Sequence, residues 1–149
     1  MRTLYSVAGS IFTFDQLTKW FAVWLLKPKG SIPVLSSFLQ LSFVENTGIA
    51  FGLFQSHPEV LTFLITVSIL GLFICARFFM GKPLLHRIAY GFILGGAVGN
   101  WFDRICFGHV TDFLDVRIEP FFRWPVFNLA DSFITVGVVL FIWFALRGR

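Results

Sequence analysis

Charged residues are scarce in this sequence. Asp, Glu, Lys and Arg make up only 13% of the 149 residues, whereas a soluble domain carries about 25%. Hydrophobic residues make up 56% and include 21 phenylalanines. This composition excludes an ordinary soluble fold. It indicates a single integral membrane domain over residues 1–149.

Metal-binding and disulfide-forming residues are also few. The two cysteines, Cys75 and Cys106, form neither a disulfide framework nor a metal-ligand pattern. The three histidines are scattered and give no His-Glu-x-x-His motif. We therefore expect no metal and no cofactor. One histidine, His109, lies three residues before Asp112, so a local role for it stays open.

Basic residues outnumber acidic ones, with a net charge of +4, but they do not gather into a basic stripe. Nucleic-acid-binding domains carry their Lys and Arg on one face or along one helix. We therefore expect no nucleic-acid partner.

Four apolar runs are long enough to cross a bilayer, which takes about 20 residues. They cover approximately residues 4–26, 60–80, 84–100 and 126–146. The first run follows Arg2 and has a signal peptide as its alternative interpretation. The apolar part of a signal peptide is shorter and uncharged, whereas this run contains Asp15 and Lys19. We therefore interpret it as a retained span.

The distribution of Lys and Arg predicts the orientation of these spans, because cytoplasmic loops carry an excess of both residues. With both termini in the cytoplasm, six bases lie in three short inner segments: Arg2, Arg77, Lys82, Arg87, Arg147 and Arg149. Five bases lie in two much longer outer segments: Lys27, Lys29, Arg104, Arg117 and Arg123. We therefore expect cytoplasmic termini and two extracytoplasmic connections.

Both extracytoplasmic connections carry signals of structure. The first, residues 27–59, is too long for a bare loop. Its residues 39–43 alternate as a short strand does, and Gly48 follows within a polar stretch. We expect a small sheet with a tight turn near Gly48. The second connection, residues 101–125, alternates in part over 110–116 and ends in an aromatic belt, Phe121, Phe122 and Trp124.

Polar and small residues interrupt two of the spans. Gly91, Gly95 and Gly99 recur every four residues in the third span, a spacing that lets helix backbones approach closely in lipid. Asp15 and Lys19 stand at i and i+4 in the first span, the favourable order for an ion pair. This pair either only neutralises itself inside the bundle or also shapes the functional site.

The strongest chemical signal is a carboxylate at the start of the last span. An ionisable residue there is expensive and indicates function. Asp131 occupies that place, with Asn128 one turn earlier on the same face, and its best partner is Asp112. Two carboxylates within hydrogen-bonding reach share a proton. The ionised member takes a proton from water and the protonated member donates one to a scissile carbonyl. The pair therefore favours peptide hydrolysis without a metal or a covalent intermediate.

Other polar residues extend this site. Asn100, Asp103 and Arg104 share one helical face if the third span continues that far. Arg104 is expected either to hold a backbone carbonyl or carboxylate, or to form a salt bridge with Asp103 or Asp115. A serine nucleophile at Ser132 is an alternative, but no base is visibly paired with it and only Lys19 would be an activator within the membrane.

Two functions from other classes stay open. A proton-coupled transporter or channel would string ionisable groups along a path through the membrane, whereas here they cluster toward one side. A structural four-span protein would use the polar residues only to lock its helices together. In that case, replacing Asp112 or Asp131 would reduce stability and nothing else.

Five motifs in order resemble those of the lipoprotein signal peptidases, the type II signal peptidases of bacteria. They are Asp15–Lys19, Asn46–Phe51, Gly95–Arg104, Val110–Phe113 and Phe127–Ser132. Any one would be a weak signal, but together they cover nearly the whole chain. Ile49 departs from the pattern, because the family more often has Ala there, which puts the shape of the turn in doubt.

This resemblance implies an aspartic endopeptidase of the bacterial cytoplasmic (inner) membrane. The enzyme would cut prolipoproteins just before a cysteine that carries a diacylglyceryl group. Asp112 and Asp131 would be the catalytic pair. The remaining site residues would bind substrate or support the pair: Asn46, Gly48, Asn100, Asp103, Arg104, Asn128, Ala130, Asp15 and Lys19.

The resemblance also implies an architecture and partners. We expect an all-α membrane protein of four transmembrane helices, with a small extracytoplasmic β-cradle and a short periplasmic helix. It would act as a monomer among membrane lipids and would bind globomycin-type inhibitors. The active site would face the periplasmic, extracytoplasmic side.

Overall fold

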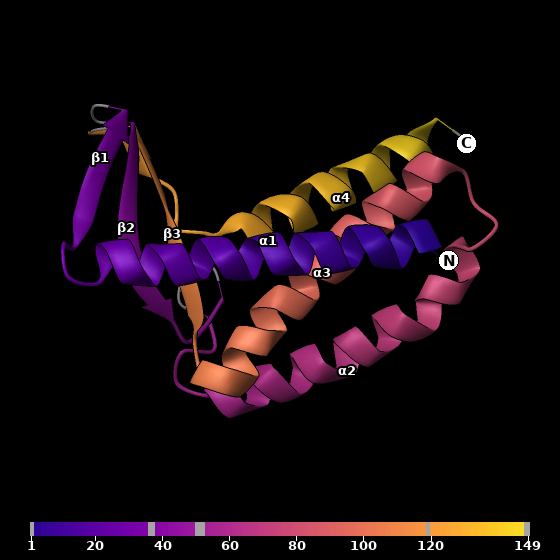
Figure 1. Ribbon diagram of the computed structural model, residues 1–149, viewed down its shortest axis with the longest axis horizontal. Coiled ribbons are helices and arrows are strands. Elements are labelled where there is room, and N and C mark those ends of the chain that lie inside the picture. Colours follow the sequence, from indigo (N-terminus) through magenta and orange to yellow (C-terminus); the bar gives the residue numbers. More distant parts are fainter. Residues whose placement is uncertain (1, 36–37, 50–52, 119, 148–149) are drawn as a thin grey trace.

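The computed structural model describes residues 2–35, 38–49, 53–118 and 120–147. Long helices run side by side, and a small antiparallel sheet lies at one end of them (Figure 1). In chain order the elements are α1 (Arg2–Leu26), β1 (Ser31–Leu35), β2 (Leu39–Asn46), α2 (Pro58–Ala76), the 3-10 helix η2 (Arg77–Phe79), α3 (Leu84–Phe107), β3 (Val110–Ile118), β4 (Phe122–Arg123) and α4 (Leu129–Leu146). The two termini lie at the end opposite the sheet.

Two helix boundaries differ from the sequence prediction. The third helix was expected to end near residue 100 but continues to Phe107, because four of the seven residues 101–107 are large and apolar and none of the seven breaks a helix. It stops at Gly108, whose φ of 76° is the left-handed conformation that glycine adopts at helix ends. The last helix begins at Leu129, not at residue 126, because Asn128 caps it. The extension of α3 places Asn100, Asp103 and Arg104 on one continuous helix.

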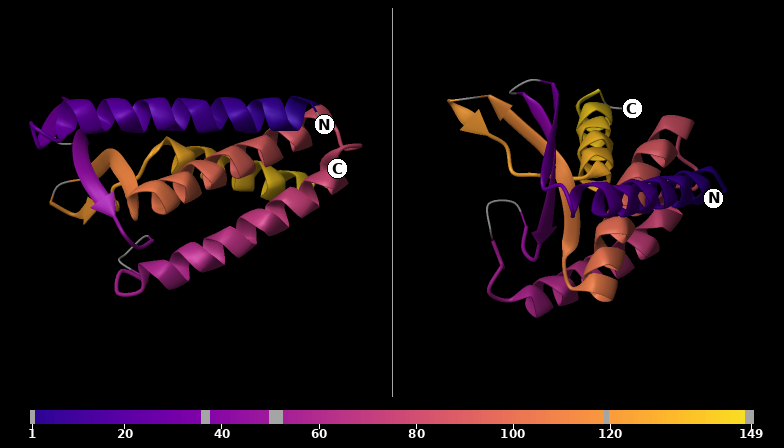
Figure 2. Two further views of the ribbon diagram at one scale, coloured as in Figure 1. Left: turned by 60° about the horizontal axis from the view of Figure 1, so that its bottom comes forward. Right: turned by 60° about the vertical axis from the view of Figure 1, so that its left-hand side comes forward.

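Helix α3 is the centre of the bundle. It packs most extensively against α1 and α4 and also contacts α2. The left-hand view of Figure 2 shows α1 and α2 on opposite sides of it. Close approach requires glycine at the crossings: a Cβ on Gly95 would lie 2.5 Å from the Ala8 carbonyl of α1, and one on Gly96 would lie 2.6 Å from the Ala130 carbonyl of α4. The predicted role of small residues in packing is therefore confirmed for α3.

Replacing Gly95 with Ala is expected to lower the free energy of unfolding by about 1–3 kcal/mol, the range for overpacked sites. The new methyl group would meet the backbone of α1, which cannot rotate away. Unfolding in detergent measures the effect. Gly71→Ala is the matched control, because nothing lies within 4 Å of its Cβ position. Equal stability of the two variants would contradict close packing at Gly95.

The sheet has the order β1-β2-β3-β4 and is antiparallel throughout. The predicted strand over 39–43 is confirmed, and it extends to Asn46. The partly alternating stretch 110–116 is a full strand that ends at Ile118. Val44 pairs with Asp112 and Asn46 with Val110, so the register brings Asn46 beside Asp112.

A short bridge connects the sheet to the last helix. The backbone of Phe127 exchanges hydrogen bonds with Leu114 at 2.8 and 3.1 Å and accepts a third from Phe113 at 3.0 Å. This bridge holds the start of α4 against β3. As a result, residues 112 and 128 become neighbours.

Two described helices are long and apolar enough to cross a membrane by length and composition, Pro58–Phe79 and Leu129–Leu146. Both expose large apolar side chains, among them Phe63, Leu70, Val139 and Ile142. Helices α1 and α3 contain charged residues well inside their length, among them Asp15, Lys19 and Asp103, which lower their mean hydropathy. The count of four spans therefore stays a prediction.

The short periplasmic helix has no counterpart among the described residues, where residues 53–56 form a turn. Ala50–Gly52, which include part of one motif, and Arg149 lie outside the described residues. The aromatic side chains of Phe121, Phe122 and Trp124 are exposed, as an interfacial belt requires.

Candidate functional site

Asn128 caps α4 and contacts both aspartates. Its side-chain Oδ1 accepts the Asp131 backbone N–H at 3.0 Å, while the Asp131 carboxylate accepts the Asn128 backbone N–H at 3.1 Å. This is a capping box, which satisfies two helix N–H groups at once. The Asn128 side-chain amide also donates to Asp112 Oδ1 at 2.7 Å. One fully buried residue therefore holds both members of the predicted pair.

Two amides hold the Asp112 carboxylate. Asn128 binds one oxygen, and Asn46 Nδ2 donates to the other at 2.8 Å. Burial, with a further contribution from the nearby Asp131 carboxylate, raises the pKa of Asp112 to about 7. The hydrogen bonds from Asn46 and Asn128 oppose this rise, because they favour the charged form. Asp112 therefore holds a proton under conditions in which an ordinary aspartate would be ionised.

Asn100 connects Asp131 to a buried lysine. Its Nδ2 donates to Asp131 Oδ1 at 2.7 Å, and its Oδ1 accepts from Lys19 Nζ at 2.8 Å. The lysine also contacts Asp15 at 2.8 Å and Asp103 at 3.0 Å. An ammonium group has three N–H donors, so these three contacts satisfy Lys19 completely.

Asp15 and Asp103 extend the network to other elements. Asp15 Oδ1 accepts the backbone N–H of Ala130 in the first turn of α4 at 3.0 Å. Asp103 Oδ2 accepts the backbone N–H of Thr111 in β3 at 3.2 Å. The predicted i, i+4 pair of Asp15 and Lys19 is confirmed. It does more than neutralise itself, since its members contact α3 and α4.

Arg104 joins the turn after β2 to α3. Its guanidinium donates to the backbone carbonyls of Gly48 at 2.7 Å and Asn100 at 3.2 Å. Gly48 in turn donates its N–H to Asn46 Oδ1 at 3.0 Å. A side chain on Gly48 would meet the Leu53 carbonyl at 2.5 Å, so the tight turn predicted here requires glycine.

The alternative prediction for Arg104, a salt bridge with Asp103 or Asp115, is wrong. Asp103 pairs with Lys19, and Asp115 accepts from Ser42, Arg117 and Arg123 in the sheet. Although burial raises the pKa of Asp115, these hydrogen bonds bring it well below its ordinary value. Asp115 is thus an ionised group that holds three strands together, and Arg104 uses backbone carbonyls.

All predicted site residues therefore belong to one connected hydrogen-bond network. Both aspartates line a cavity of about 430 Å³ between α2, α3, α4 and β3. Its polar end also includes Asn46, Asn100 and Arg104, and its walls are mostly apolar, with Ile65, Ile69, Leu72, Ala97 and Ile134. The cavity can therefore hold a ligand whose apolar chain lies along the apolar walls and whose polar group lies at the carboxylates.

The serine alternative has no support in this geometry. The Ser132 hydroxyl donates to the Asn128 carbonyl one turn earlier at 3.0 Å, and Lys19 is fully engaged elsewhere. Among the described residues, no cluster of three or more His, Cys, Asp or Glu side chains is placed to hold a metal ion. His109 lies 3.9 Å from Glu45 and lines a different cavity from the two aspartates.

Two residues of the network lie within the sequence motifs, but no role was predicted for either. Gln16 Nε2 donates to Asp103 at 2.9 Å and to Asp15 at 3.2 Å. Thr111 accepts from the Asn128 amide through its carbonyl at 3.4 Å. A polar residue within an apolar run was a usable signal for Gln16. No local signal pointed to Thr111, because its backbone makes the contacts.

Known proteins resemble this chain over nearly its whole length. The family model described as signal peptidase (SPase) II matches residues 7–147. Lipoprotein signal peptidases of Thermodesulfovibrio yellowstonii and Syntrophotalea carbinolica are 38% and 41% identical, over 94% and 92% of this chain and 94% and 86% of theirs.

Two solved structures, each described as a bacterial membrane enzyme, have the same fold. Their TM-scores are 0.81 and 0.82 at 29% and 33% identity. The matches cover 99% and 100% of this chain and 89% and 96% of the solved chains. The chain therefore belongs to the signal peptidase II family.

Proposed function

We propose that this protein is an aspartic endopeptidase that removes signal peptides from diacylglyceryl-modified prolipoproteins. It would cut just before the lipidated cysteine. The observation that carries this proposal is the shared contact of Asp112 and Asp131 with Asn128 at the end of an apolar cavity. Membership of the signal peptidase II family supports both the reaction class and the substrate class.

The two carboxylates have different surroundings, and this difference supports a different role for each. Asp112 is buried and its pKa is raised to about 7, so it would be the protonated member of the pair near neutral pH. Asp131 lies in the first turn of α4, where the helix dipole favours negative charge. Asp131 would take a proton from water, which then attacks the scissile carbonyl carbon. Asp112 would donate its proton to the carbonyl oxygen, which gives a tetrahedral intermediate. As the C–N bond breaks, Asp131 would pass the proton from water to the leaving nitrogen, and Asp112 would take a proton back from a hydroxyl of the intermediate.

The other site residues would position the substrate and support the pair. Asn46, Asn100 and Arg104 line the cavity beside the aspartates, while Gly48 and Arg104 hold the turn above it. Asp15, Lys19 and Asp103 would fix Asn100 and the start of α4 from the other side. The apolar walls would accommodate the acyl chains of the diacylglyceryl group and globomycin-type inhibitors.

We further propose four membrane-spanning helices in the bacterial cytoplasmic membrane, with both termini in the cytoplasm. The sheet and the termini lie at opposite ends of the helices (Figure 1), which supports an extracytoplasmic sheet. The proposed site lies at the sheet end of the bundle. The protein would act as one domain and as a monomer, without a cofactor.

The decisive experiment compares one prolipoprotein with and without its diacylglyceryl group. Purified protein is incubated with each form, and cleavage is followed by the shift in gel mobility. We expect cleavage of the lipidated form only, at the bond before the cysteine. Cleavage of neither form, or equal cleavage of both, would contradict the proposed substrate class.

The rate of cleavage is expected to fall as pH rises through about 7. Asp112 is protonated below its raised pKa and loses its proton above it, so the general acid disappears on the alkaline side. Replacing Asn46 with Ala removes a hydrogen bond that favours the carboxylate form. The alkaline limb of the pH–rate profile should then move to higher pH, by about one unit.

Ser68→Ala is the control for this profile. Ser68 lines the same cavity, but its hydroxyl donates to the Leu64 carbonyl of its own helix. Its replacement should leave the limb in place. If the alkaline limb of the Asn46→Ala pH–rate profile did not move, or moved to lower pH, Asp112 would not be the group that titrates.

A further inference from the structure

A second cavity, of about 590 Å³, lies between α1, the end of α3 and strands β2 and β3. None of the residues that line it also lines the cavity with the two aspartates. The proposed reaction does not use it. Its volume lies within the range of small-molecule and cofactor sites.

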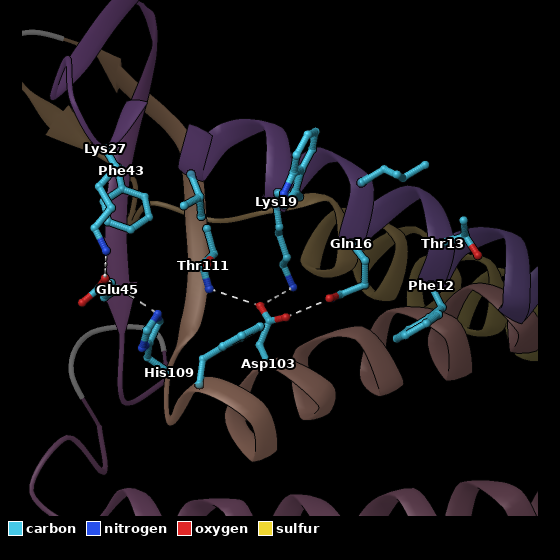
Figure 3. Close-up of a pocket in the computed structure, with 14 residues that line it drawn as sticks. Phe12, Thr13, Gln16, Lys19, Lys27, Phe43, Glu45, Asp103, His109 and Thr111 are labelled. Atoms are coloured by element: carbon cyan, nitrogen blue, oxygen red, sulfur yellow. Dashed lines mark hydrogen bonds and ion pairs between the residues drawn. The ribbon is translucent and has the colours of Figure 1, made fainter. Parts of the chain in front are cut away.

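One end of this cavity is charged. Glu45 lies between two bases, with its Oε1 3.4 Å from Lys27 Nζ and 3.9 Å from His109 Nε2 (Figure 3). Both distances exceed those of a tight charge-assisted hydrogen bond, about 2.7–2.9 Å. These contacts are therefore weak, so a ligand's polar groups can compete for Glu45 and for the two bases.

The other end is apolar and open to the side. Leu17 and Trp20 of α1 line it and are each more than half exposed, and Phe107 of α3, beside His109, continues the exposed apolar rim toward the charged end. Phe12 and Thr13 lie toward the end away from the sheet, opposite Lys27 and Glu45 (Figure 3). In a bilayer, such a surface contacts acyl chains.

The buried polar groups on the floor need no ligand. Lys19 and Asp103 are bonded to each other at 3.0 Å, and Thr111 donates to Asp103. A polar ligand would find no unsatisfied partner there. Recognition of a headgroup therefore falls to Lys27, Glu45 and His109.

The geometry points to a binding site for a bilayer phospholipid with a zwitterionic, primary-amine headgroup of the ethanolamine class. Its ammonium would donate to Glu45, and its phosphate would accept from Lys27 and His109. Its acyl chains would follow α1 past Trp20 toward Phe12. An anionic headgroup fits less well, because its phosphate would meet Glu45 without a compensating ammonium. The inference rests on the proposed membrane placement and not on the catalytic assignment.

Native mass spectrometry tests this site without any substrate, so its result is independent of peptidase activity. Protein is extracted from bilayers with equal amounts of phosphatidylethanolamine, phosphatidylcholine and phosphatidylglycerol, and retained lipid is counted for each class. We expect preferential retention of phosphatidylethanolamine. Glu45→Gln should lower that retention about tenfold or more, the effect of losing one hydrogen bond to a charged group.

Two further variants separate the parts of the site. Glu59→Gln is the matched control, because Glu59 is also an exposed carboxylate beside a histidine, His57, but lies away from the cavity. It should retain lipid as the unmodified protein does. Val23→Phe narrows the apolar part and should reduce retention of every class.

Three outcomes would overturn the inference. One is equal retention by the unmodified protein and Glu45→Gln. The second is a preference for phosphatidylglycerol or phosphatidylcholine. The third is displacement of the retained lipid by a diacylglyceryl-modified peptide. That result would show that this second cavity binds the substrate instead.

Discussion

Replacing either Asp112 or Asp131 with Asn is expected to slow cleavage of a lipidated prolipoprotein by at least about a thousandfold, within the range that general acid–base groups contribute. Asparagine has nearly the same shape as aspartate but neither takes a proton from water nor donates a carboxylic proton. The contacts of Asn46 and Asn128 with Asp112 would persist in part. The measurement is single-turnover cleavage in detergent, followed by gel shift.

The double variant should be hardly slower than either single variant, because residues that act as one unit are not additive. Glu59→Gln controls for the loss of a carboxylate, since Glu59 is exposed on α2 and outside the cavity. All variants must still insert and show the thermal stability of the unmodified protein within a few degrees. Near-normal turnover by either Asn variant would refute the proposal that Asp112 and Asp131 are the catalytic pair.

A stability loss without loss of turnover would favour the purely structural interpretation of the polar residues. A transporter interpretation makes a different prediction, because it requires Asp15-dependent flux in liposomes. Within the structure, Asp15 is fully buried and accepts from Ala130 and Lys19. This arrangement suits a fixed support better than a group that must open to both sides of a membrane.

The sequence predicted the elements because the signals were local. Long apolar runs indicate helices, and glycines at intervals of four indicate close packing, as the contact of Gly95 with α1 confirms. Asn128 and Asp131 at i and i+3 were expected on one face and form a capping box. The end of α3 was missed because the polar residues Asp103 and Arg104 suggested a loop, although their partners are buried inside the fold.

Contacts between distant residues were outside the reach of such signals. The register that pairs Val44 with Asp112 depends on a bulge in β2 between Leu41 and Val44, and nothing in the sequence specifies its position. The partner of Arg104 is a backbone carbonyl 56 residues away. Backbone carbonyls occur at every residue, so no side-chain pattern identifies one of them as a partner.

Lys19→Met is expected to lower the free energy of unfolding by about 3–5 kcal/mol, the range for breaking a buried ion pair. The Lys19 side chain is only 4% exposed and contacts two carboxylates and one amide oxygen. Methionine fills a similar volume but leaves Asp15 and Asp103 buried beside each other without a cation. Asn100 also loses a donor, so its contact with Asp131 should loosen and cleavage should slow. Unfolding in mixed micelles measures the stability.

Lys27→Met is the matched control, because Lys27 directly follows the same helix and is also paired with a carboxylate. The side chains of Lys27 and Glu45 are 62% and 45% exposed, and Lys27 Nζ lies 3.4 Å from Glu45 Oε1. Exposed pairs contribute at most about 1 kcal/mol, so this variant should unfold nearly as the unmodified protein does. A second variant, Lys19→Met with Asp103→Asn, removes one of the stranded charges and should recover part of the loss. Equal stability of Lys19→Met and Lys27→Met would show that the buried network does not stabilise the packing of α1 against α3 and α4.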